Sequence, residues 1–141
     1  MISWTNALVT GFDEIDLQHK TLIKLINGLE VTVQRGETAD HAHVGEMLRF
    51  LEGYARTHFA REERCMTETH CPAAQTNQRA HAQFLQDYQQ LKQRFDEQQA
   101  PDTLLMEIYT MASRWITNHI CRVDVRLRDC VPARKSVASR T

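Results

Sequence analysis

Two pairs of polar residues stand at i,i+4 spacing in neighbouring segments of the chain: His58 with Glu62, and Asn77 with His81. On an α-helix, residues four apart lie one turn apart on the same face, so an imidazole and a carboxylate at this spacing can bind the same ion. These donors together suit iron, manganese or zinc, and a carboxylate can also bridge two ions. The pattern therefore predicts a metal site built on helices.

Three further residues extend this pattern, with His19 upstream and His119 and Asp124 downstream. Glu62 and Asp124 are the natural bridging groups, so the whole set predicts a buried site for two metal ions. His119 and Asp124 are five residues apart, which does not align them on a straight α-helix, and we expect a π-bulge between them. Glu63 should point about 100° away from Glu62, toward solvent or a surface partner.

Four histidines share the helical phase of the apolar residues around them, one in each of four segments: His19, His58, His81 and His119. This phase places each imidazole on the inward face of its helix. A lone histidine on an apolar face is more often a core residue than a ligand. Four of them buried together with two carboxylates would need an ion or a dense polar network to offset the burial of charge. The other three, near the expected helix ends, should be solvated: His41, His43 and His70.

The elements that must position these residues follow from the apolar pattern. Apolar residues recur at helical spacing in four blocks, 15–29, 44–66, 84–95 and 104–123, and no segment alternates strictly as a β-strand does. The short connections between blocks favour antiparallel neighbours. We predict an all-α, up-down-up-down antiparallel four-helix bundle with an N-terminal arm of about a dozen residues. The expected domain spans residues 1–130, and residues 131–141 form a polar, basic tail or linker.

The composition narrows the choice of partner and compartment. The 141 residues carry a formal charge of −1 from interspersed acids and bases, which argues against nucleic acid or an anionic membrane as the main partner. Neither a transmembrane run nor a signal-peptide pattern is found, so we expect a soluble cytoplasmic protein. The four cysteines form no C-x-x-C pair and are expected to be reduced. A redox-active pair of Cys65 and Cys71 is the minor alternative.

Taken together, the motifs resemble the haemerythrin family, specifically its bacterial haemerythrin-like domains. The resemblance runs over nearly the whole chain, through residues 4–11, residues 15–20, His58-Phe59, Glu62-Glu63, Met66, Trp115-Ile116, His119-Ile120 and Asp124. It implies a non-haem di-iron centre, with an oxo or hydroxo bridge, that binds O2. The ligands it implies are His19 and His58 for one iron, His81 and His119 for the other, and Glu62 and Asp124 as bridges.

The chain departs from the family pattern at one position. Asn77 falls where the family has the first histidine of an H-x3-H pair, which leaves four histidines instead of five. An amide oxygen is a poor substitute for imidazole on iron, so the ion held by His81 and His119 should have an open or water-filled position. Alternatively, Asn77 hydrogen-bonds to an iron-bound water, and O2 binding stays reversible.

This departure favours an O2 or redox sensor that regulates an attached or partner signalling module, such as a diguanylate cyclase. A free-standing O2 carrier or scavenger is the alternative, and a di-iron oxidase or peroxidase is a third hypothesis. We expect no enzymatic activity from the domain itself, although a C-terminal output domain could be an enzyme. The expected ligand is O2 or another small diatomic molecule or anion. Candidates for an apolar wall around it are Phe59, Trp115, Ile116 and Ile120.

Overall fold

The computed structural model describes residues 1–35, 41–98 and 102–130. Its four long helices are α1 (Asp13–Arg35), α2 (His41–Glu68), α3 (Ala74–Gln98) and α4 (Asp102–Arg122). Three short helical elements are η1 (Asn6–Leu8), η3 (Asp124–Arg126) and α5 (Leu127–Cys130). No β-strand is found among the described residues, so the predicted all-α class is confirmed.

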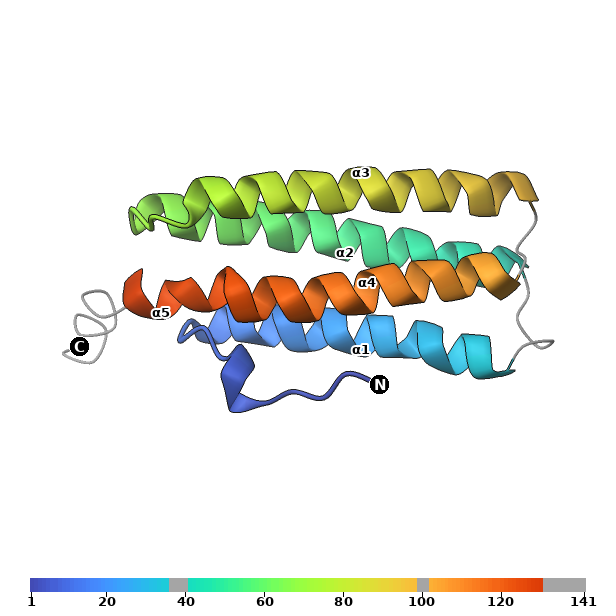
Figure 1. The fold of residues 1–141 in the computed structure, drawn as a ribbon, viewed down its shortest axis with the longest axis horizontal. Helices are drawn as coiled ribbons and strands as arrows, with labels where there is room; N and C mark the ends of the chain where they lie inside the picture. The colour runs from blue at the N-terminus through green and yellow to red at the C-terminus, as the bar shows by residue number, and fades with distance from the viewer. Residues whose placement is uncertain (36–40, 99–101, 131–141) are drawn as a thin grey trace.

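The long helices lie side by side and alternate in direction (Figure 1). Helix α1 packs against α2 and α4, and α3 packs against the same two helices, so each helix contacts its neighbours around a ring. This is the predicted up-down-up-down four-helix bundle. None of the described helices has the length and apolar character needed to span a membrane.

The apolar residues of the four predicted blocks fill the interior of the bundle. A large cluster runs between all four long helices and includes Leu22, Leu48, Phe84 and Ile108. A second, smaller cluster gathers residues from the start of α1, the end of α2, the α2–α3 connection and the segment after α4: Ile15, Cys65, Met66, Cys71, Ala73, Val123 and Leu127. We call it the end cluster.

Helix α2 ends in a backbone motif that also places Cys71. His70 has a positive φ of 54°, a left-handed conformation more often adopted by glycine. The N–H of His70 donates to Thr67 O at 3.1 Å, and the N–H of Cys71 donates to Met66 O at 2.8 Å. These two bonds form a Schellman motif, in which the side chains of Cys71 and Met66 meet in the end cluster. His70 and His43 are exposed as expected, while the side chain of His41 lies outside the described residues.

The N-terminal arm is fixed to α1 by side-chain hydrogen bonds. Asn27 pairs with both backbone groups of Ile2, accepting from the N–H and donating to the carbonyl, each at 2.9 Å. Asp16 accepts from the N–H of Thr10 at 2.8 Å and from its hydroxyl at 2.9 Å. Gly11, which lies between Thr10 and Asp16 in the sequence, turns the chain with a φ of 92°, which a residue with a side chain rarely adopts. The arm therefore meets α1 at a defined angle.

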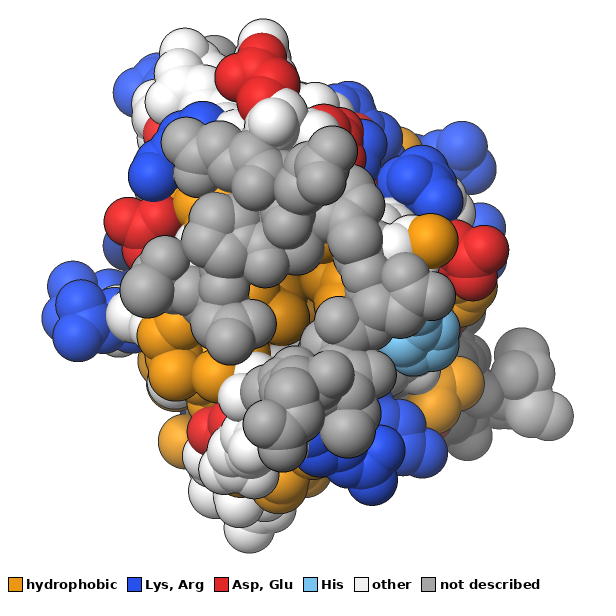
Figure 2. All heavy atoms as spheres, turned by 90° about the vertical axis from the view of Figure 1, so that its right-hand side faces the viewer, with side chains coloured by type: hydrophobic (Ala, Val, Ile, Leu, Met, Phe, Trp, Pro, Cys, Tyr) orange, Lys and Arg blue, Asp and Glu red, His pale blue; other side chains and the backbone are white. Residues whose placement is uncertain are grey.

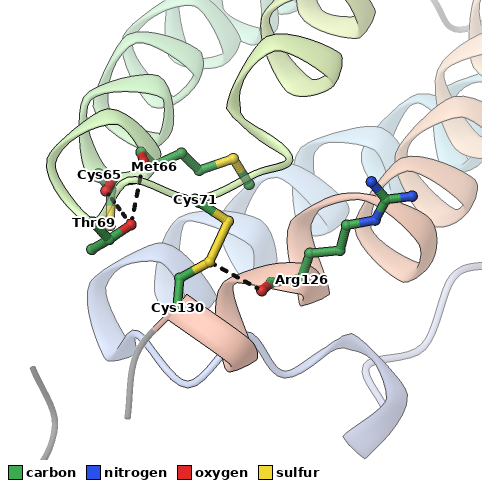
Figure 3. Close-up of a disulfide and its surroundings, with 6 residues drawn as sticks. All are labelled: Cys65, Met66, Thr69, Cys71, Arg126 and Cys130. Carbon is green, nitrogen blue, oxygen red and sulfur yellow. Dashed lines mark hydrogen bonds between the residues drawn. A yellow bond between two sulfur atoms is a disulfide. The ribbon is translucent and has the colours of Figure 1, made fainter. Parts of the chain in front are cut away.

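The cysteines differ from the sequence-based expectation. Cys71 and Cys130 form a disulfide, with their Cα atoms 5.6 Å apart (Figure 3). Reduced thiols were the wrong prediction for these two residues, and the alternative pairing of Cys65 with Cys71 is not formed. The reason is a long-range contact: the chain after α4 folds back against the α2–α3 connection, 59 residues away in sequence.

The opposite end of the bundle is shown in Figure 2. Hydrophobic side chains are visible near the middle of this face, and Lys or Arg side chains lie close to Asp or Glu side chains around its edge. Both signs of charge are therefore mixed on this face, as the overall composition predicts. The predicted tail at residues 131–141 lies outside the described residues.

Candidate metal centre

Each of the four long helices contributes to one buried polar cluster inside the bundle. The side chains come from α1 (His19), α2 (His58, Glu62), α3 (Asn77, His81), α4 (His119) and η3 (Asp124), and every one of these residues is at most 5% exposed. All seven residues predicted from the sequence are therefore brought together. The helical phase of the histidines explains this, because each lies on the face that its helix turns to the core.

Asp124 reaches the cluster by a route that the sequence analysis did not predict. Helix α4 ends at Arg122, and Asp124 begins the 3₁₀ turn η3 after a break at Val123, where φ is −114° and ψ is −57°. The expected π-bulge is therefore wrong. Because the chain leaves the α-helix before Asp124, the 100° step of α4 no longer applies, and the carboxylate can face His119.

The two oxygens of Glu62 face different histidines. Oε2 lies 3.0 Å from Nε2 of His19 and 3.6 Å from Nε2 of His58. Oε1 lies 3.1 Å from Nε2 of His81. The carboxylate thus stands between the histidines of α1 and α2 on one side and a histidine of α3 on the other.

The two carboxylate oxygens of Asp124 also face different histidines. Its Oδ2 lies 3.1 Å from Nε2 of His19, and its Oδ1 lies 2.9 Å from Nε2 of His119. Each carboxylate therefore offers one oxygen to the half of the cluster that contains His19 and the other oxygen to the half that contains His81 and His119. This is the arrangement expected of groups that bridge two ions.

The donor atoms fit metal ions in type and spacing. Two overlapping groups each have their ligand atoms within 4.8 Å of one another: Glu62, His81, His119 and Asp124, and His19, His58 and Glu62. Neutral imidazoles with carboxylates are the donors that iron and similar transition metals accept. Nε2 of His81 and Nε2 of His119 lie 3.2 Å apart, so both nitrogens can face the same ion.

Two residues outside the predicted set orient the imidazoles. Nδ1 of His58 lies 2.6 Å from Oε1 of Gln18, and Nδ1 of His81 lies 2.9 Å from Oε2 of Glu63. When Nδ1–H donates outward, the Nε2 lone pair is left facing the centre, which is the tautomer a metal needs. Glu63 is partly exposed, as predicted, but its contact with a buried histidine was missed. Its position next to Glu62 was the only signal in the sequence.

Asn77 is held on both sides within the cluster. Its Nδ2 donates to Oε1 of Glu62 at 3.1 Å, and its Oδ1 lies 2.7 Å from Nε2 of His119. The amide therefore belongs to the half of the cluster that contains His81 and His119. The i,i+4 spacing of Asn77 and His81 on α3 predicts this position.

The charges of the cluster stabilise one another. Burial lowers the pKa of His19, but hydrogen bonds to Asp124 and Glu62 outweigh it and raise that pKa to about 9. Burial also lowers the pKa of His81, but the hydrogen bonds that His81 donates to Glu62 and Glu63 outweigh burial and raise that pKa. Burial raises the pKa of the Glu62 carboxyl, but hydrogen bonds from His19 and His81, together with electrostatic attraction to the neighbouring histidines, hold it well below its usual range. The cluster thus holds Glu62 ionised beside a protonated His19.

His58 behaves differently from His19. Burial and the neighbouring histidines lower the pKa of His58 to about 3, against the attraction of Glu62. It is therefore neutral at physiological pH. With Gln18 accepting from Nδ1, its Nε2 is available as a ligand without loss of a proton.

Aromatic rings cover one side of the cluster. Phe59 stacks on the His81 imidazole with centroids 3.8 Å apart and an interplanar angle of 8°. Trp115 stacks on His119 at 4.3 Å and 12°, and it packs against Phe59 at 5.5 Å. The other two candidates for an apolar wall, Ile116 and Ile120, are buried in the large core cluster.

Comparison with known proteins agrees with this geometry. The family model described as the hemerythrin HHE cation binding domain matches residues 10–127. The chain belongs to the haemerythrin family. Haemerythrin domains bind O2 at non-haem iron, and the cluster of histidines, Glu62 and Asp124 fits that chemistry.

Relatives within this family are similar over most of their length. A bacteriohemerythrin of Stenotrophomonas maltophilia is 34% identical over 94% of this chain and 83% of its own. One from Pseudomonas aeruginosa is 32% identical over 91% of this chain and 80% of its own. One from Methylococcus capsulatus is 25% identical over 94% of this chain and 98% of its own. The similarity therefore covers the whole bundle instead of one motif.

Proposed function

We propose that this haemerythrin domain holds a non-haem di-iron centre, binds O2 and acts as an O2 or redox sensor. The main support for the proposal is the position of the carboxylates of Glu62 and Asp124. Each carboxylate has one oxygen beside His19 and the other oxygen beside His81 or His119. Two carboxylates held in this way suit the bridging of two ions. The proposed ligands are His19 and His58 for one iron, His81 and His119 for the other, and Glu62 and Asp124 as bridges.

When bound, the iron pair supplies the electrons and the open position with which the domain takes up O2. The chain itself controls what reaches the pair. The rings of Phe59 and Trp115 cover the imidazoles of His81 and His119. With Ile116 and Ile120 they form the proposed apolar wall, which keeps bulk water out and admits a small diatomic molecule.

Asn77 is the reason for proposing a sensor. Its amide oxygen stands on the side of His81 and His119, where it is a weaker donor to iron than an imidazole nitrogen. One iron would therefore have fewer strong protein donors than a haemerythrin site usually offers. A single water molecule or a small anion can then coordinate this ion in place of the missing imidazole, and the reduced centre should oxidise readily. A centre that changes state easily on contact with O2 suits a sensor better than a carrier.

The proposed output is an attached or partner signalling module in the cytoplasm, such as a diguanylate cyclase. Asp124 supports this, because it is both a proposed ligand and the first residue of η3. From there the chain passes directly through α5 to Cys130. A change in the way Asp124 is held would therefore act on the C-terminal segment. We assign no enzymatic activity to the domain itself.

A free-standing O2 carrier or scavenger is the second candidate. The cover formed by Phe59 and Trp115 favours it, because an apolar wall also slows the loss of bound ligand to water. The two functions differ in what happens after O2 arrives. A sensor centre should pass quickly to an oxidised state, and a carrier centre should release O2 unchanged.

The test is the metal content and the optical spectrum of anaerobically reduced protein as air is admitted, for the wild type and for Asn77→His. We expect about two irons per chain and rapid conversion to the oxidised spectrum, which the added imidazole of Asn77→His should slow. Gln78→His, at the exposed neighbouring position, is the matched control and should behave as the wild type.

Other outcomes of this experiment select the other hypotheses. A wild-type spectrum that persists in air and reverses when O2 is removed would support the carrier. Continued consumption of peroxide or of an organic electron donor would support an oxidase or peroxidase. A chain that binds no iron under any loading condition would overturn the di-iron proposal.

A further inference from the structure

The Cys71–Cys130 disulfide joins the two segments that lead to the metal centre at this end of the bundle (Figure 3). Cys71 lies in the α2–α3 connection, six residues before Asn77. Cys130 is the last residue of α5, six residues after Asp124. The covalent bond therefore connects the α2–α3 connection, which leads into the helix that carries Asn77, to the segment that carries Asp124.

The other attachments of the segment that contains η3 and α5, residues 124–130, are noncovalent. The Asp124 carboxylate contacts His19 and His119, and the partly buried Val125 packs against the large core cluster. Leu127 is fully buried in the end cluster. The Arg128 guanidinium donates to three carbonyls of the arm: Val9 O at 2.6 Å, Asn6 O at 2.9 Å and Ala7 O at 3.2 Å. Arg128 is exposed, so these bonds compete with water. Among the described residues, the disulfide is the one covalent cross-link from this segment to another part of the bundle.

The two sulfur atoms differ in their access to a thiol reagent. Cys71 is 5% exposed and packs in the end cluster, whereas Cys130 lies partly exposed at its edge. A thiolate can therefore reach the Cys130 sulfur first. The Arg126 carbonyl lies 3.6 Å from that sulfur, where it can accept a hydrogen bond from the thiol once the bond is broken (Figure 3). The reduced Cys130 thiol can therefore make this hydrogen bond without a change of fold.

We propose that Cys71–Cys130 is a reversible redox latch, opened by a dithiol reductant, that sets how firmly Asp124 is held at the metal centre. This inference rests on the proposed di-iron function. One thiolate of the reductant attacks the Cys130 sulfur, the Cys71 sulfur leaves and takes a proton, and a mixed disulfide forms. The second thiol then attacks the reductant's own sulfur in the mixed disulfide. The products are two protein thiols and the oxidised, disulfide form of the reductant, so two electrons and two protons pass to the protein.

The reducing conditions of the cytoplasm, the proposed compartment, favour a disulfide that opens and closes over one that is permanent. Disulfides persist in oxidising compartments, but in the cytoplasm they are usually transient or redox-sensing. A cytoplasmic haemerythrin domain with this bond would therefore respond to the supply of reductant. Opening the latch leaves Leu127 and Arg128 in place, so residues 124–130 become looser without unfolding the bundle. The domain would then hold its metal pair less tightly under reducing conditions.

In the first measurement, the native, metal-free protein is treated with diamide or with dithiothreitol and the reagent is removed. The protein is then denatured and alkylated, and the alkylated thiols are counted by intact-mass analysis. Since the chain has four cysteines and the bond uses two, oxidation should leave two alkylatable thiols in denatured protein and reduction four. Four thiols after diamide treatment would show that the bond does not form. Two thiols after native treatment with dithiothreitol would show a staple that cannot switch. Either result overturns the latch.

The second measurement is hydrogen exchange of the metal-free protein followed by mass spectrometry. Reduction should speed exchange at residues 124–130 by about tenfold or more, while amides in the middle of α1 stay unchanged. The Cys71→Ser/Cys130→Ser double variant should reproduce the reduced state without reductant. Cys121→Ser, at an exposed cysteine outside the disulfide, is the matched control and should exchange as the wild type. Equal exchange in oxidised and reduced protein would overturn the latch.

The third measurement is the rate at which a chelator removes ferrous iron under anaerobic conditions. Removal should be about tenfold faster from the reduced protein and from the double variant than from the oxidised protein. If iron binds but leaves all forms at one rate, the latch fails and the di-iron proposal stands. If no form binds iron, the di-iron proposal fails, and the exchange measurement alone decides for or against the latch.

Discussion

Asn77 donates a hydrogen bond from its side-chain Nδ2 to Oε1 of Glu62, over 3.1 Å, in the fully buried centre of the bundle. The same oxygen of Glu62 lies 3.1 Å from His81. The amide nitrogen of Asn77 thus holds the Glu62 carboxylate in place, whereas the amide oxygen of Asn77 is only a weak ligand for a metal. Asn77 therefore positions Glu62 in the metal-free protein at the expense of one strong donor in the metal-loaded one.

Exchanging Asn77 for aspartate should separate these two roles. In the metal-free protein, Asn77→Asp removes the donor to Glu62 and brings two carboxylates together, so the free energy of unfolding should fall by roughly 1–3 kcal/mol. In the iron-loaded protein the new carboxylate is a stronger donor, so stability should be regained. Thermal unfolding with and without metal measures both effects. Gln78→Glu adds the same charge at the exposed neighbouring residue as a control, and an equal loss in both metal states would contradict the argument.

Removing the carboxylate that contacts His81 should weaken one metal position. Glu63→Gln keeps the size of the side chain but loses the charge that accepts from Nδ1 of His81. Loss of such an outer partner typically lowers metal affinity by about 10–100-fold. In metal-free protein, the pKa of His81, which Glu63 helps to raise, should fall. Metal titration and NMR of the imidazole check both effects. The exposed Glu46→Gln is the control, and unchanged affinity in Glu63→Gln would show that the contact is incidental.

Metal binding should release protons and strengthen as the pH rises. His19 has a pKa of about 9 in the metal-free protein, so it is protonated at neutral pH and must lose that proton to bind a metal. Affinity should therefore rise by about tenfold per pH unit, for each proton released, up to pH 9. His58, with a pKa of about 3, releases none. Calorimetric titration in buffers of different ionisation enthalpy measures the number of protons. A heat of binding that does not depend on the buffer would contradict it.

The stability of the metal-free protein should change in the opposite direction over the same range. The pKa of His19 is raised above its usual value of 6.5, so its contribution to stability is complete below pH 6.5 and is lost as the pH rises through about 9. Urea unfolding of metal-free protein between pH 6.5 and 9 should therefore show a falling free energy. Metal-loaded protein should show no such fall. Parallel behaviour of the two forms would contradict the assignment of the shift to His19.

Opening the aromatic cover should affect both stability and oxidation. Phe59 is buried and stacked on His81, so Phe59→Ala should cost about 3–5 kcal/mol of unfolding free energy and should let water reach the centre. Oxidation of the ferrous protein in air should then be faster. Phe50→Ala is the matched control, because Phe50 lies on the same helix but is 62% exposed. Loss of stability without faster oxidation would show that Phe59 is only a core residue.

The limits of sequence-based prediction are clear at Asp124 and Glu63. The sequence correctly placed Asp124 at the centre, but the expected π-bulge was wrong. The chain leaves α4 at Arg122 because Val123 and Leu127, on either side of η3, pack into the end cluster. For Glu63, helical phase gave a partly exposed side chain and missed its contact with His81. That contact depends on how α2 and α3 are aligned along their axes, which the periodicity of one helix does not contain.

What the sequence by itself determined is the set of helices and the inward position of seven polar residues, because helical phase depends only on local spacing. Tertiary structure alone decided which oxygen of Glu62 and of Asp124 faces which histidine, and which outer residue orients each imidazole. It also decided the pairing of Cys71 with Cys130 across 59 residues. These features depend on the axial alignment and rotation of packed helices and on the path of the chain after α4, which are fixed by contacts between distant segments.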